Sequence, residues 1–580
     1  MCGIVGYVGY REAAPVCTAG LRRLEYRGYD SYGVAVVGDA GLSVFKQVGK
    51  ISESASAAHH LTGRVGIGHT RWATHGVPSE RNSHPHLDCT GKIAVVHNGI
   101  IENYAELRRG LEERGHVFSS DTDTEVIPHL IEEQEGDLFS AVSAVLPMLE
   151  GSYAILVVKE GCDEVVAARK GSPLVLGVGD AEFVLASDSL PILEYTRSVV
   201  YFEDGDCARI TPAGYVLCHD GQEVERSLSH LEWGVDEVRK GGFSHYMLKE
   251  IFEQPDVFAN TLRAVKDSSE AMTMIRAARS LTVVACGTSA NAAMVFSYLM
   301  ERVCRVPTRV ILGSEFKYFP PPLDGLVIGV SQSGETADTI AALKLAKETG
   351  SSVLAVTNVL GSSITRVASA VVYTRAGPEM SVAATKSFTA QVAAFMQVVN
   401  LLSEHGCESE LCEIQRYLAD VLTLDLAEAV KLCTSASTLL YVGRGVFYPA
   451  ALEGALKMKE ISYIHAEGYA AGELKHGPFA LLSPETPVVA ICVPGPVYAV
   501  MISNLREITA RGAPVIAVGV VGDRDLEDIA DVFVPLPAIS EYGLLVLSSV
   551  VLQMLAYHTA VALERDVDMP RNLAKSVTVE

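Results

Sequence analysis

The feature that most constrains the fold is an alternation of apolar runs with helical stretches, which begins near residue 265. Continuous apolar segments lie at 280–287, 325–331, 351–358 and 370–377, and stretches with helical spacing of apolar residues separate them. Strands that are buried on both faces read as unbroken apolar runs. The alternation therefore predicts a doubly wound parallel sheet with helices on both faces.

The same order of elements then starts again. Apolar segments at 437–445, 486–495, 513–522 and 531–537 fall between helical stretches. This internal repeat rests on the order of the elements more than on residue identity. It predicts two similar doubly wound α/β lobes, which we place at 263–408 and 425–570, followed by an extended tail at 571–580.

The first part of the chain has a different texture. Residues 1–225 contain many strand-like segments bounded by Gly, Asp and Asn turns, with few helices between them. This pattern predicts packed, largely antiparallel sheets. The polar stretch 226–262 is expected to be a linker that leads into a helix.

Charge and cysteine usage exclude several classes of protein. The 580 residues carry 47 Lys and Arg against 70 Asp and Glu, a formal net charge of −23. This balance disfavours a dedicated binder of nucleic acid or anionic membrane, since phosphate contacts need clustered cations. The 12 cysteines are scattered without a CxxC pair, so we expect no zinc ribbon, no thioredoxin-like site and no disulfide framework.

Localisation is expected to be cytoplasmic. The N-terminus has no basic segment before its apolar stretch, as a signal peptide would. The most apolar long segment, 544–563, carries Ser548, Ser549 and Gln553, which suit a buried helix better than a membrane span.

Cys2 is the first candidate catalytic residue. Removal of Met1 would leave one residue that carries both a thiol and a free α-amine. The amine can take the thiol proton, so the pair makes an efficient nucleophile. From position alone, Cys2 is better explained as a small buried residue that opens a strand.

Polar groups at later strand ends favour the catalytic interpretation. Arg71 could hold a carboxylate with two parallel hydrogen bonds. Asn98 and Gly99 could donate N–H groups to an oxyanion, and the acidic segment 121–125 could hold an ammonium group. Taken singly, these residues would also suit a turn or a helix cap.

Six ordered motifs resemble the N-terminal-nucleophile glutamine amidotransferase family: CGIVG, LRRLEYRGYDS, HTRWATHG, NSHPH, HNGIIENY and DTDTE. The resemblance implies a four-layer αββα fold for residues 1–225. It implies that Cys2 attacks the γ-amide of glutamine, with Asn98 and Gly99 as the oxyanion hole. Trp72 is the implied channel gate, although the sequence leaves open that it is a large core side chain. The implied glutamine-binding residues are Arg27, Gly28, Arg71, Thr74, His75 and Asp123.

The first predicted lobe carries two polar loops at strand ends. Segments 286–289 and 331–336 each end a strand and open a helix. Ligands bind beyond the carboxyl ends of parallel strands, and helix N-termini suit phosphate. Either loop alone would be explained as a Ser/Thr helix cap, but two at equivalent places favour a phosphate pocket. The chain has no GxxxxGK motif, which disfavours a nucleoside triphosphate.

Glu453, Lys457 and Glu460 share one face of a predicted helix, because they are spaced i, i+4 and i+7. Spacing alone favours a solvated row of ion pairs. The otherwise apolar helix and the Gly- and Ala-rich segment that follows it favour a buried site. A carboxylate and a histidine there could supply the base and acid that an aldose–ketose isomerisation needs.

These motifs resemble sugar isomerase (SIS) domains, and the order of all motifs resembles enzymes that join glutamine hydrolysis to sugar isomerisation. The resemblance implies that Ser289, Ser331, Gln332, Ser333 and Thr336 bind the sugar phosphate. Glu460 would move the C1/C2 proton, and His476 would assist ring opening. Lys457 and Lys575 would act at the reactive end of the sugar, which the tail 571–580 enters.

The implied reaction converts L-glutamine and D-fructose 6-phosphate into D-glucosamine 6-phosphate and L-glutamate, the first step of hexosamine biosynthesis. Ammonia would pass internally between the two sites, and no cofactor or metal would take part. The family also suggests a homodimer. Two alternatives stay open from the sequence: a different glutamine amidotransferase, and a non-catalytic regulator that binds phosphosugars.

Overall fold

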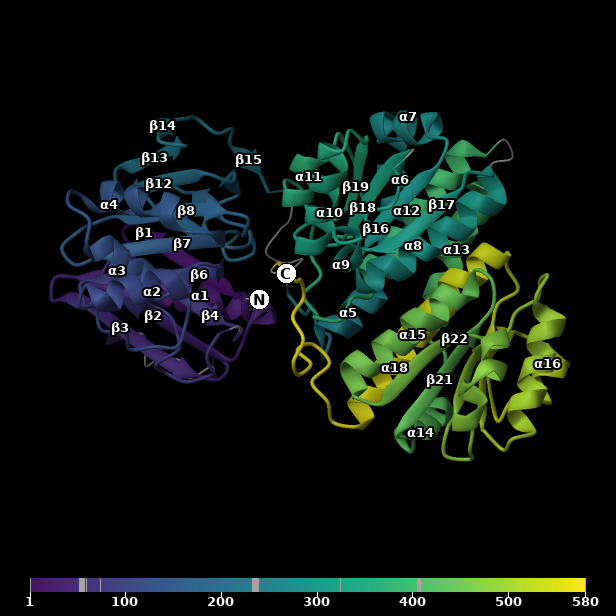
Figure 1. The fold of residues 1–580 in the computed structure, drawn as a ribbon. Coiled ribbons are helices and arrows are strands. Elements are labelled where there is room, and N and C mark those ends of the chain that lie inside the picture. Colours follow the sequence, from purple (N-terminus) through teal and green to yellow (C-terminus); the bar gives the residue numbers. More distant parts are fainter. Residues whose placement is uncertain are drawn as a thin grey trace. The chain divides into compact units, whose positions relative to one another are not determined.

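The computed structural model describes residues 2–51, 58, 60–73, 75–231, 239–323, 325–403 and 408–578. The chain divides into two compact units (Figure 1). Unit 1 comprises Met1–Val238 with Ser576–Glu580, and unit 2 comprises Arg239–Lys575. Each unit is described by itself.

Unit 1 contains two antiparallel sheets. The eight-stranded sheet has the order β15-β11-β9-β10-β1-β4-β2-β3, and the seven-stranded sheet has the order β14-β13-β12-β8-β7-β6-β5. The strands of the first sheet are β1 (Gly3–Val8), β2 (Ser31–Gly38), β3 (Gly41–Val48), β4 (Val65–Arg71), β9 (Val175–Val178), β10 (Phe183–Ala186), β11 (Ser198–Tyr201) and β15 (Ser229–His230). Those of the second are β5 (His86–Leu87), β6 (Ile93–Ile101), β7 (Gly151–Lys159), β8 (Val165–Lys170), β12 (Asp206–Thr211), β13 (Gly214–His219) and β14 (Gln222–Glu223).

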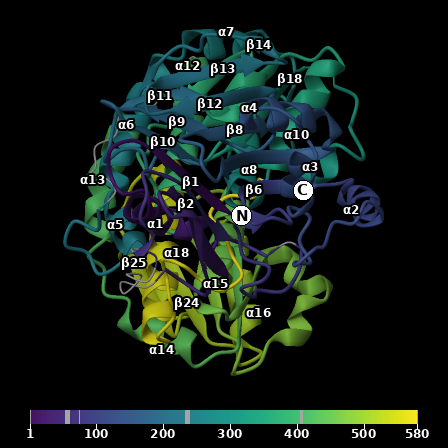
Figure 2. The ribbon, with the colours of Figure 1, turned by 90° about the vertical axis from the view of Figure 1, so that its left-hand side faces the viewer.

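Helices cover the outer face of each sheet of unit 1 (Figure 1, Figure 2). Helix α1 (Ala13–Arg23) packs on β1, β2 and β4, while α3 (Val126–Glu132) and α4 (Leu138–Val145) pack on the second sheet. Helix α2 (Tyr104–Glu113) packs on α3, and short 3-10 helices lie at Glu25–Arg27 and Leu146–Met148. A core that includes Ile4, Ala94 and Leu156 joins the two sheets. The predicted αββα layering is therefore confirmed.

Unit 2 contains two five-stranded parallel sheets of the same topology. Their orders are β17-β16-β18-β19-β20 and β22-β21-β23-β24-β25. The first consists of β16 (Leu281–Ala285), β17 (Thr308–Leu312), β18 (Leu326–Ser331), β19 (Val353–Thr357) and β20 (Ala370–Tyr373). The second consists of β21 (Thr438–Gly443), β22 (His465–Ala470), β23 (Val488–Ile491), β24 (Val515–Val520) and β25 (Val532–Leu536). The two doubly wound lobes predicted from the weak repeat are thus confirmed.

The helices of unit 2 pack around these sheets. In the first lobe they are α5 (Tyr246–Phe252), α6 (Gln254–Lys266), α7 (Ser269–Ala277), α8 (Gly287–Leu299), a π-helix at Met300–Cys304, α9 (Gly313–Phe316), α10 (Ala337–Glu348), α11 (Ser363–Val367) and α12 (Lys386–Leu402). Helices α13 (Glu408–Val421) and α14 (Ala427–Thr434) lead to α15 (Phe447–Ser462), to 3-10 helices at Ala471–His476 and Pro478–Leu481, and to α16 (Tyr498–Thr509), α17 (Arg524–Glu527) and α18 (Glu541–Ala562).

One continuous core runs through both lobes of unit 2. It includes Phe296 of α8, Phe395 of α12, Met458 of α15 and Leu552 of α18. Helix α18 is long and apolar enough to cross a membrane, but 89% of its most apolar window is buried inside the protein. It is therefore the core helix of a soluble protein, as its internal Ser and Gln residues predicted.

Candidate active sites

The first site lies where β1 begins. Antiparallel pairing places Gly3 opposite Thr70, so the residue before it, Cys2, lies beside the end of β4. There the Trp72 N–H donates to the Cys2 Sγ at 3.2 Å. Burial raises the pKa of the Cys2 thiol, while this hydrogen bond and the Arg71 charge act to lower it. The thiol therefore needs a nearby base to become a nucleophile.

Asn98 and Gly99 belong to β6 in the other sheet, and Asn98 reaches Cys2 directly. The Asn98 Nδ2 donates to the Cys2 carbonyl at 3.1 Å. The buried Asn98 Oδ1 has no hydrogen-bond partner among the described residues. Gly99 has a φ of 133°, and a Cβ at this position would lie 2.0 Å from the Ser152 carbonyl oxygen. Only glycine fits there, so the amide at position 99 stays unobstructed beside Asn98.

Arg71 ends β4 and turns toward the loop that follows it. Its guanidinium donates to the backbone carbonyls of His75 and Gly76, the latter at 2.9 Å. Its buried Nη1 has no hydrogen-bond partner in the described part of the chain. Burial lowers the pKa of Arg71. Thr74, which the motif resemblance assigned to the same loop, lies outside the described residues.

Asp123 is buried next to the start of α3. Its Oδ2 accepts a 2.8 Å hydrogen bond from the Ile101 N–H at the end of β6. Asp123 also acts electrostatically on both Cys2 and Arg71. The acidic segment is thereby tied to the strand that carries Asn98.

Arg27 and Gly28 follow the short 3-10 helix after α1. The Arg27 guanidinium forms an ion pair with Asp188 at 2.5 Å, and the Gly28 carbonyl accepts a hydrogen bond from the Thr70 hydroxyl. Trp72 packs edge-to-face on Tyr29, with ring centroids 5.8 Å apart. These contacts hold the 27–29 segment against the end of β4, next to the residues around Cys2.

The second site lies in unit 2, where the strand order of the first lobe reverses. Strands β16 and β18 are neighbours, and their helices start from adjacent carboxyl ends. In open α/β sheets this switch point is where ligands bind. Ser289 lies in the first turn of α8, which follows β16, and residues 331–336 lie at the end of β18, so topology brings the two polar segments together as expected.

The loop after β18 is held by its own hydroxyl groups. Ser331 Oγ lies 2.8 Å from Thr336 Oγ1 and accepts from the Gly334 N–H at 3.0 Å. The Ser333 hydroxyl accepts from the Glu335 N–H at 3.2 Å. Gly334 has a φ of 68°, and a Cβ there would lie 2.1 Å from Ser362 Oγ, so this tight turn requires glycine. In the first turn of α8, the Ser289 hydroxyl accepts a hydrogen bond from the Gln391 side-chain amide at 3.0 Å.

Lys457 lies in a buried charged cluster between the two lobes. Its Nζ forms ion pairs with Glu460 and with Glu453, the latter at 3.5 Å, and the side-chain exposures of Lys457 and Glu453 are 1% and 2%. Burial alone would lower the pKa of Lys457, but the two carboxylates raise it, so the ammonium stays charged. The interpretation as a solvated row of ion pairs is therefore wrong for this helix.

The first lobe completes this cluster. The Thr288 hydroxyl donates to Glu453 at 3.0 Å and accepts from Lys457 at 3.1 Å, and Asn291 donates to Glu453 at 2.8 Å. Sequence reasoning missed Thr288 and Asn291 as partners of α15. The only available signal was that both follow the Cys286-Gly287 strand end.

The tail brings Lys575 to the loop between β20 and α12. There it forms a buried ion pair with Glu379, whose carboxylate also accepts from the N–H groups of Thr385 and Ser387. Burial alone would raise the pKa of Glu379, but the Lys575 charge and these hydrogen bonds lower it to about 2. Glu379 is a third residue that sequence reasoning missed, because it lies in a loop without periodicity.

His476 stands apart from the other candidates. It is exposed at the end of the 3-10 helix Ala471–His476 and makes no hydrogen bond or ion pair with a described residue. Gln332 lies in the loop after β18, where its carbonyl accepts from the Asn358 N–H at 3.1 Å. The described side chains thus bring together Ser331 with Thr336, and Lys457 with Glu460, but not His476 with either pair.

Comparison with known proteins agrees with this two-part arrangement. Residues 69–194 match the glutamine amidotransferase domain, and 274–401 and 432–563 match the SIS domain. A glutamine–fructose-6-phosphate aminotransferase (isomerizing) of Thermus thermophilus is 46% identical over 604 aligned positions, covering 100% of both chains. The chain belongs to this aminotransferase family.

Further relatives support the assignment to the isomerizing aminotransferases. The enzyme of that name from Symbiobacterium thermophilum is 47% identical over 609 aligned positions and covers 100% of both chains. The solved C-terminal domain of the glucosamine-fructose-6-phosphate aminotransferase from Francisella tularensis is 33% identical. It matches 57% of this chain and 100% of its own with a TM-score of 0.53.

Proposed function

We propose how the two sites divide the reaction of this aminotransferase between them. The chain synthesises D-glucosamine 6-phosphate from D-fructose 6-phosphate and L-glutamine. The full-length relationship carries this conclusion, since both the glutaminase and the sugar isomerase halves are present. The same relationship argues against both alternatives from the sequence: a non-catalytic regulator that binds phosphosugars, and a glutamine amidotransferase that acts on another acceptor.

In the glutaminase half, Cys2 attacks the γ-amide carbon of glutamine once Met1 has been removed. The released α-amine takes the thiol proton, which offsets the rise in thiol pKa that burial causes. A tetrahedral intermediate forms and collapses to a γ-glutamyl thioester. The proton passes to the departing nitrogen, which leaves as ammonia, and water then releases glutamate.

Different residues would bind the developing oxyanion and the α-carboxylate and α-ammonium groups of the glutamine substrate. Asn98 Nδ2, already within hydrogen-bond reach of Cys2, and the Gly99 N–H would stabilise the developing oxyanion. Arg71, through its unpartnered Nη1, would bind the α-carboxylate, and Asp123 would bind the α-ammonium. Arg27, Gly28, Thr74 and His75 would complete the glutamine pocket.

In the isomerase half, the hydroxyl groups at the switch point would bind the phosphate of the sugar. Ser331 ends β18, and Ser333 and Thr336 precede α10, whose first N–H groups favour an anion. Ser289 approaches from the neighbouring helix α8, and Gln332 lies within the same loop. With its phosphate bound there, the sugar would have its reactive C1–C2 end directed toward the charged cluster.

The charged cluster would perform the isomerisation. Ammonia adds to the C2 carbonyl of the ketose and water leaves, which gives an imine. Glu460 takes the C1 proton and returns it to C2 through an enamine-type intermediate, which leaves the amino aldose. Lys457 and Lys575, which form ion pairs with Glu460 and Glu379, would stabilise the developing oxyanion, and His476 would serve in ring opening.

Ammonia must reach the sugar unprotonated, because ammonium is not a nucleophile. We therefore infer that nitrogen passes between the sites without entering solvent, with Trp72, whose N–H contacts the nucleophile, as the gate. We also infer, from the family resemblance, that the active form is a cytoplasmic homodimer joined through the isomerase half.

The decisive experiment supplies fructose 6-phosphate and glutamine that carries heavy nitrogen in its amide. Purified protein should place the label in glucosamine 6-phosphate. Excess unlabelled ammonium in the buffer should not dilute the label, because the nitrogen is passed internally. No glucosamine 6-phosphate would contradict the proposed reaction, and label dilution would contradict internal transfer alone.

A further inference from the structure

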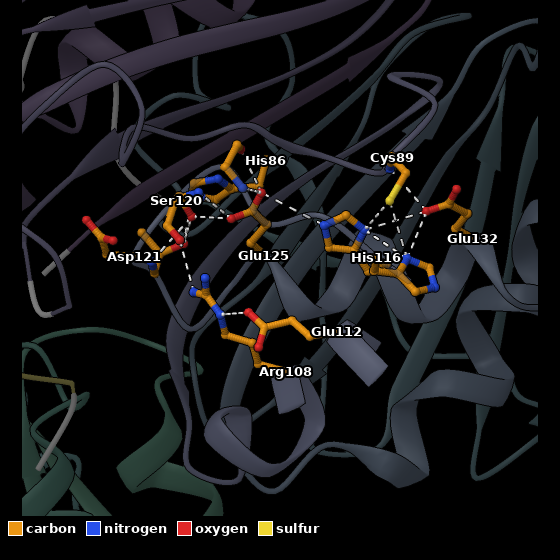
Figure 3. Close-up of polar contacts among 12 residues, drawn as sticks. His86, Cys89, Arg108, Glu112, His116, Ser120, Asp121, Glu125 and Glu132 are labelled. Atoms are coloured by element: carbon orange, nitrogen blue, oxygen red, sulfur yellow. Dashed lines mark hydrogen bonds and ion pairs between the residues drawn. The ribbon is translucent and has the colours of Figure 1, made fainter. Parts of the chain in front are cut away.

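Unit 1 contains a cluster of four metal-ligating side chains that the glutaminase reaction does not use. Cys89 lies in the turn between β5 and β6, His116 follows α2, and His129 and Glu132 lie on α3. One ligand atom from each residue lies within 4.8 Å of all the others. Figure 3 shows Cys89, His116 and Glu132 directed toward one another from these separate segments.

The distances between these atoms match the edges of a small tetrahedron. Cys89 Sγ lies 3.4 Å from the Nδ1 atoms of His116 and His129, and these two nitrogens are 3.3 Å apart. Glu132 Oε2 lies 3.3 Å and 3.5 Å from the same nitrogens. Tetrahedral zinc with ligands at about 2.0–2.3 Å has ligand–ligand distances of roughly 3.3–3.6 Å.

Each histidine also has a carboxylate on its far side. His116 Nε2 lies 3.2 Å from Glu133 Oε1, and Arg114 fixes that carboxylate with hydrogen bonds of 2.6 Å and 3.1 Å. His129 Nε2 is buried, has no hydrogen-bond partner among the described residues and lies 3.9 Å from Glu125 Oε1, the nearest carboxylate in an ion-pair contact with it. A carboxylate behind the ligating histidine orients the ring and fixes its tautomer in metal sites.

The charges of the four ligands suit a divalent cation. The two ring nitrogens of His116 face the carboxylates of Glu132 and Glu133. A metal at Nδ1 would leave Nε2 to face Glu133. Two neutral imidazoles, one thiolate and one carboxylate balance the charge of a divalent cation, and the thiol proton is released to solvent.

We propose that Cys89, His116, His129 and Glu132 bind one structural zinc ion. Mixed sulfur, nitrogen and oxygen ligands in tetrahedral geometry favour Zn²⁺ over Mg²⁺ or Ca²⁺. Four protein ligands leave no open position, so the site stabilises structure and performs no chemistry. Cys89 is exposed, which gives the ion a path into the site.

The zinc site would anchor the segment that we assign to glutamine binding. Glu125, at the start of α3, accepts hydrogen bonds of 2.7 Å and 2.6 Å from the Ser119 and Ser120 N–H groups. Glu125 is also the carboxylate behind His129, and Asp123 lies two residues before it. Zinc would thus join the β5–β6 turn to α3 and restrict the motion of Asp123. Only this role in glutamine binding rests on the proposed function; the zinc site itself does not.

The test measures zinc in the purified full-length protein by elemental analysis after dialysis against zinc and then against zinc-free buffer. Wild type should retain one zinc per chain. Cys89→Ser should retain none, and Cys412→Ser, a matched exposed thiol in α13, should retain one. Glu133→Gln should weaken zinc affinity roughly ten- to hundred-fold, through loss of the carboxylate behind His116.

Cobalt substitution reports the geometry independently of activity. Co²⁺ in wild type should give the strong visible absorption of a tetrahedral site and a thiolate charge-transfer band, and Cys89→Ser should lose that band. Equal zinc retention by wild type and Cys89→Ser, with both folded by circular dichroism, would overturn the proposal and leave a hydrogen-bonded polar cluster. Unchanged glutamine KM after zinc removal would overturn only the role in glutamine binding.

Discussion

Lys457 in α15 donates a 3.1 Å hydrogen bond to Thr288 in α8, and so joins the two lobes of unit 2 through a buried polar contact. The same ammonium lies 3.5 Å from Glu453. Burial raises the pKa of Glu453, whereas Lys457 and the hydrogen bond from Asn291 act to lower it. Lys457 therefore balances a buried carboxylate as well as serving the proposed chemistry.

The first prediction is that Lys457→Ala destabilises unit 2. Removal of one member of a buried charge pair leaves the other uncompensated and costs about 3–5 kcal/mol. Denaturant unfolding followed by circular dichroism measures the change. Lys459→Ala on the exposed side of the same helix is the control and should unfold like wild type. Equal midpoints for the two variants would show that Glu453 does not depend on Lys457.

The sequence predicted the position of the loop at residues 331–336 better than it predicted the burial of the charged cluster. Ser331 and Thr336 could be placed because carboxyl ends of neighbouring parallel strands meet at one edge of the sheet. Glu453, Lys457 and Glu460 have the same spacing on a buried helix as on a solvated one, so only packing against α8 decides between the two. Burial of Lys457 therefore could not be read from its own helix.

The proposed zinc ligands show a second limit of prediction from the sequence, because they are far apart along the chain. His129 and Glu132 have the i, i+3 spacing of ligands on one helix face, which was the available signal. Cys89 is 40 residues from His129 in sequence, and His116 is 13 residues away. Only the packing of α2 and α3 over the second sheet brings these residues together. The sequence has no CxxC pair that would have indicated a metal site here.

The second prediction is that Cys2→Ala abolishes glutamine-dependent synthesis of glucosamine 6-phosphate and spares phosphosugar isomerisation. The two activities use separate residue sets, and alanine removes the thiol without adding bulk. Product formation and fructose-to-glucose 6-phosphate conversion are measured on the same preparation. Cys162→Ser, another free thiol of unit 1, should keep both activities. Glutamine-dependent product from Cys2→Ala would refute its assignment as the nucleophile.

The third prediction is that Glu460→Gln blocks isomerisation and leaves binding of fructose 6-phosphate largely intact. The amide keeps the shape of the side chain but cannot take a proton from carbon, so kcat should fall roughly 10²- to 10⁴-fold. Calorimetric titration with fructose 6-phosphate separates binding from turnover. Glu485→Gln, an exposed glutamate of the same lobe, provides the comparison. Normal turnover by Glu460→Gln would remove Glu460 from its role.

The fourth prediction is that Ser331→Ala raises the KM for fructose 6-phosphate roughly ten-fold or more. A hydrogen bond to a charged group contributes about 1.5–3 kcal/mol, and Ser331 also holds the Gly334 N–H. Initial rates over a range of sugar phosphate measure this, with Ser352→Ala, at an exposed position just before β19, as the control. If KM were unchanged, the phosphate would bind elsewhere in the lobe.

The fifth prediction concerns pH and a buried carboxyl group near Lys575. Burial, and then the neighbouring charge of Glu379, raise the pKa of Glu250 from 4.5 to about 8. The buried Glu250 Oε2 has no hydrogen-bond partner within the described residues. Between these two pH values the folded protein holds a proton that the unfolded chain has released.

Stability from Glu250 is therefore fully present below about pH 4.5 and is lost as the pH rises toward 8. Glu250→Gln, which stays neutral, should flatten this decline and unfold at a higher temperature than wild type at pH 8. Thermal unfolding across this range measures the slope, with Glu348→Gln on the exposed end of α10 as the control. An equal slope in wild type and Glu250→Gln would mean that Glu250 is ionised in the folded protein, because its proton would then contribute nothing to the pH dependence.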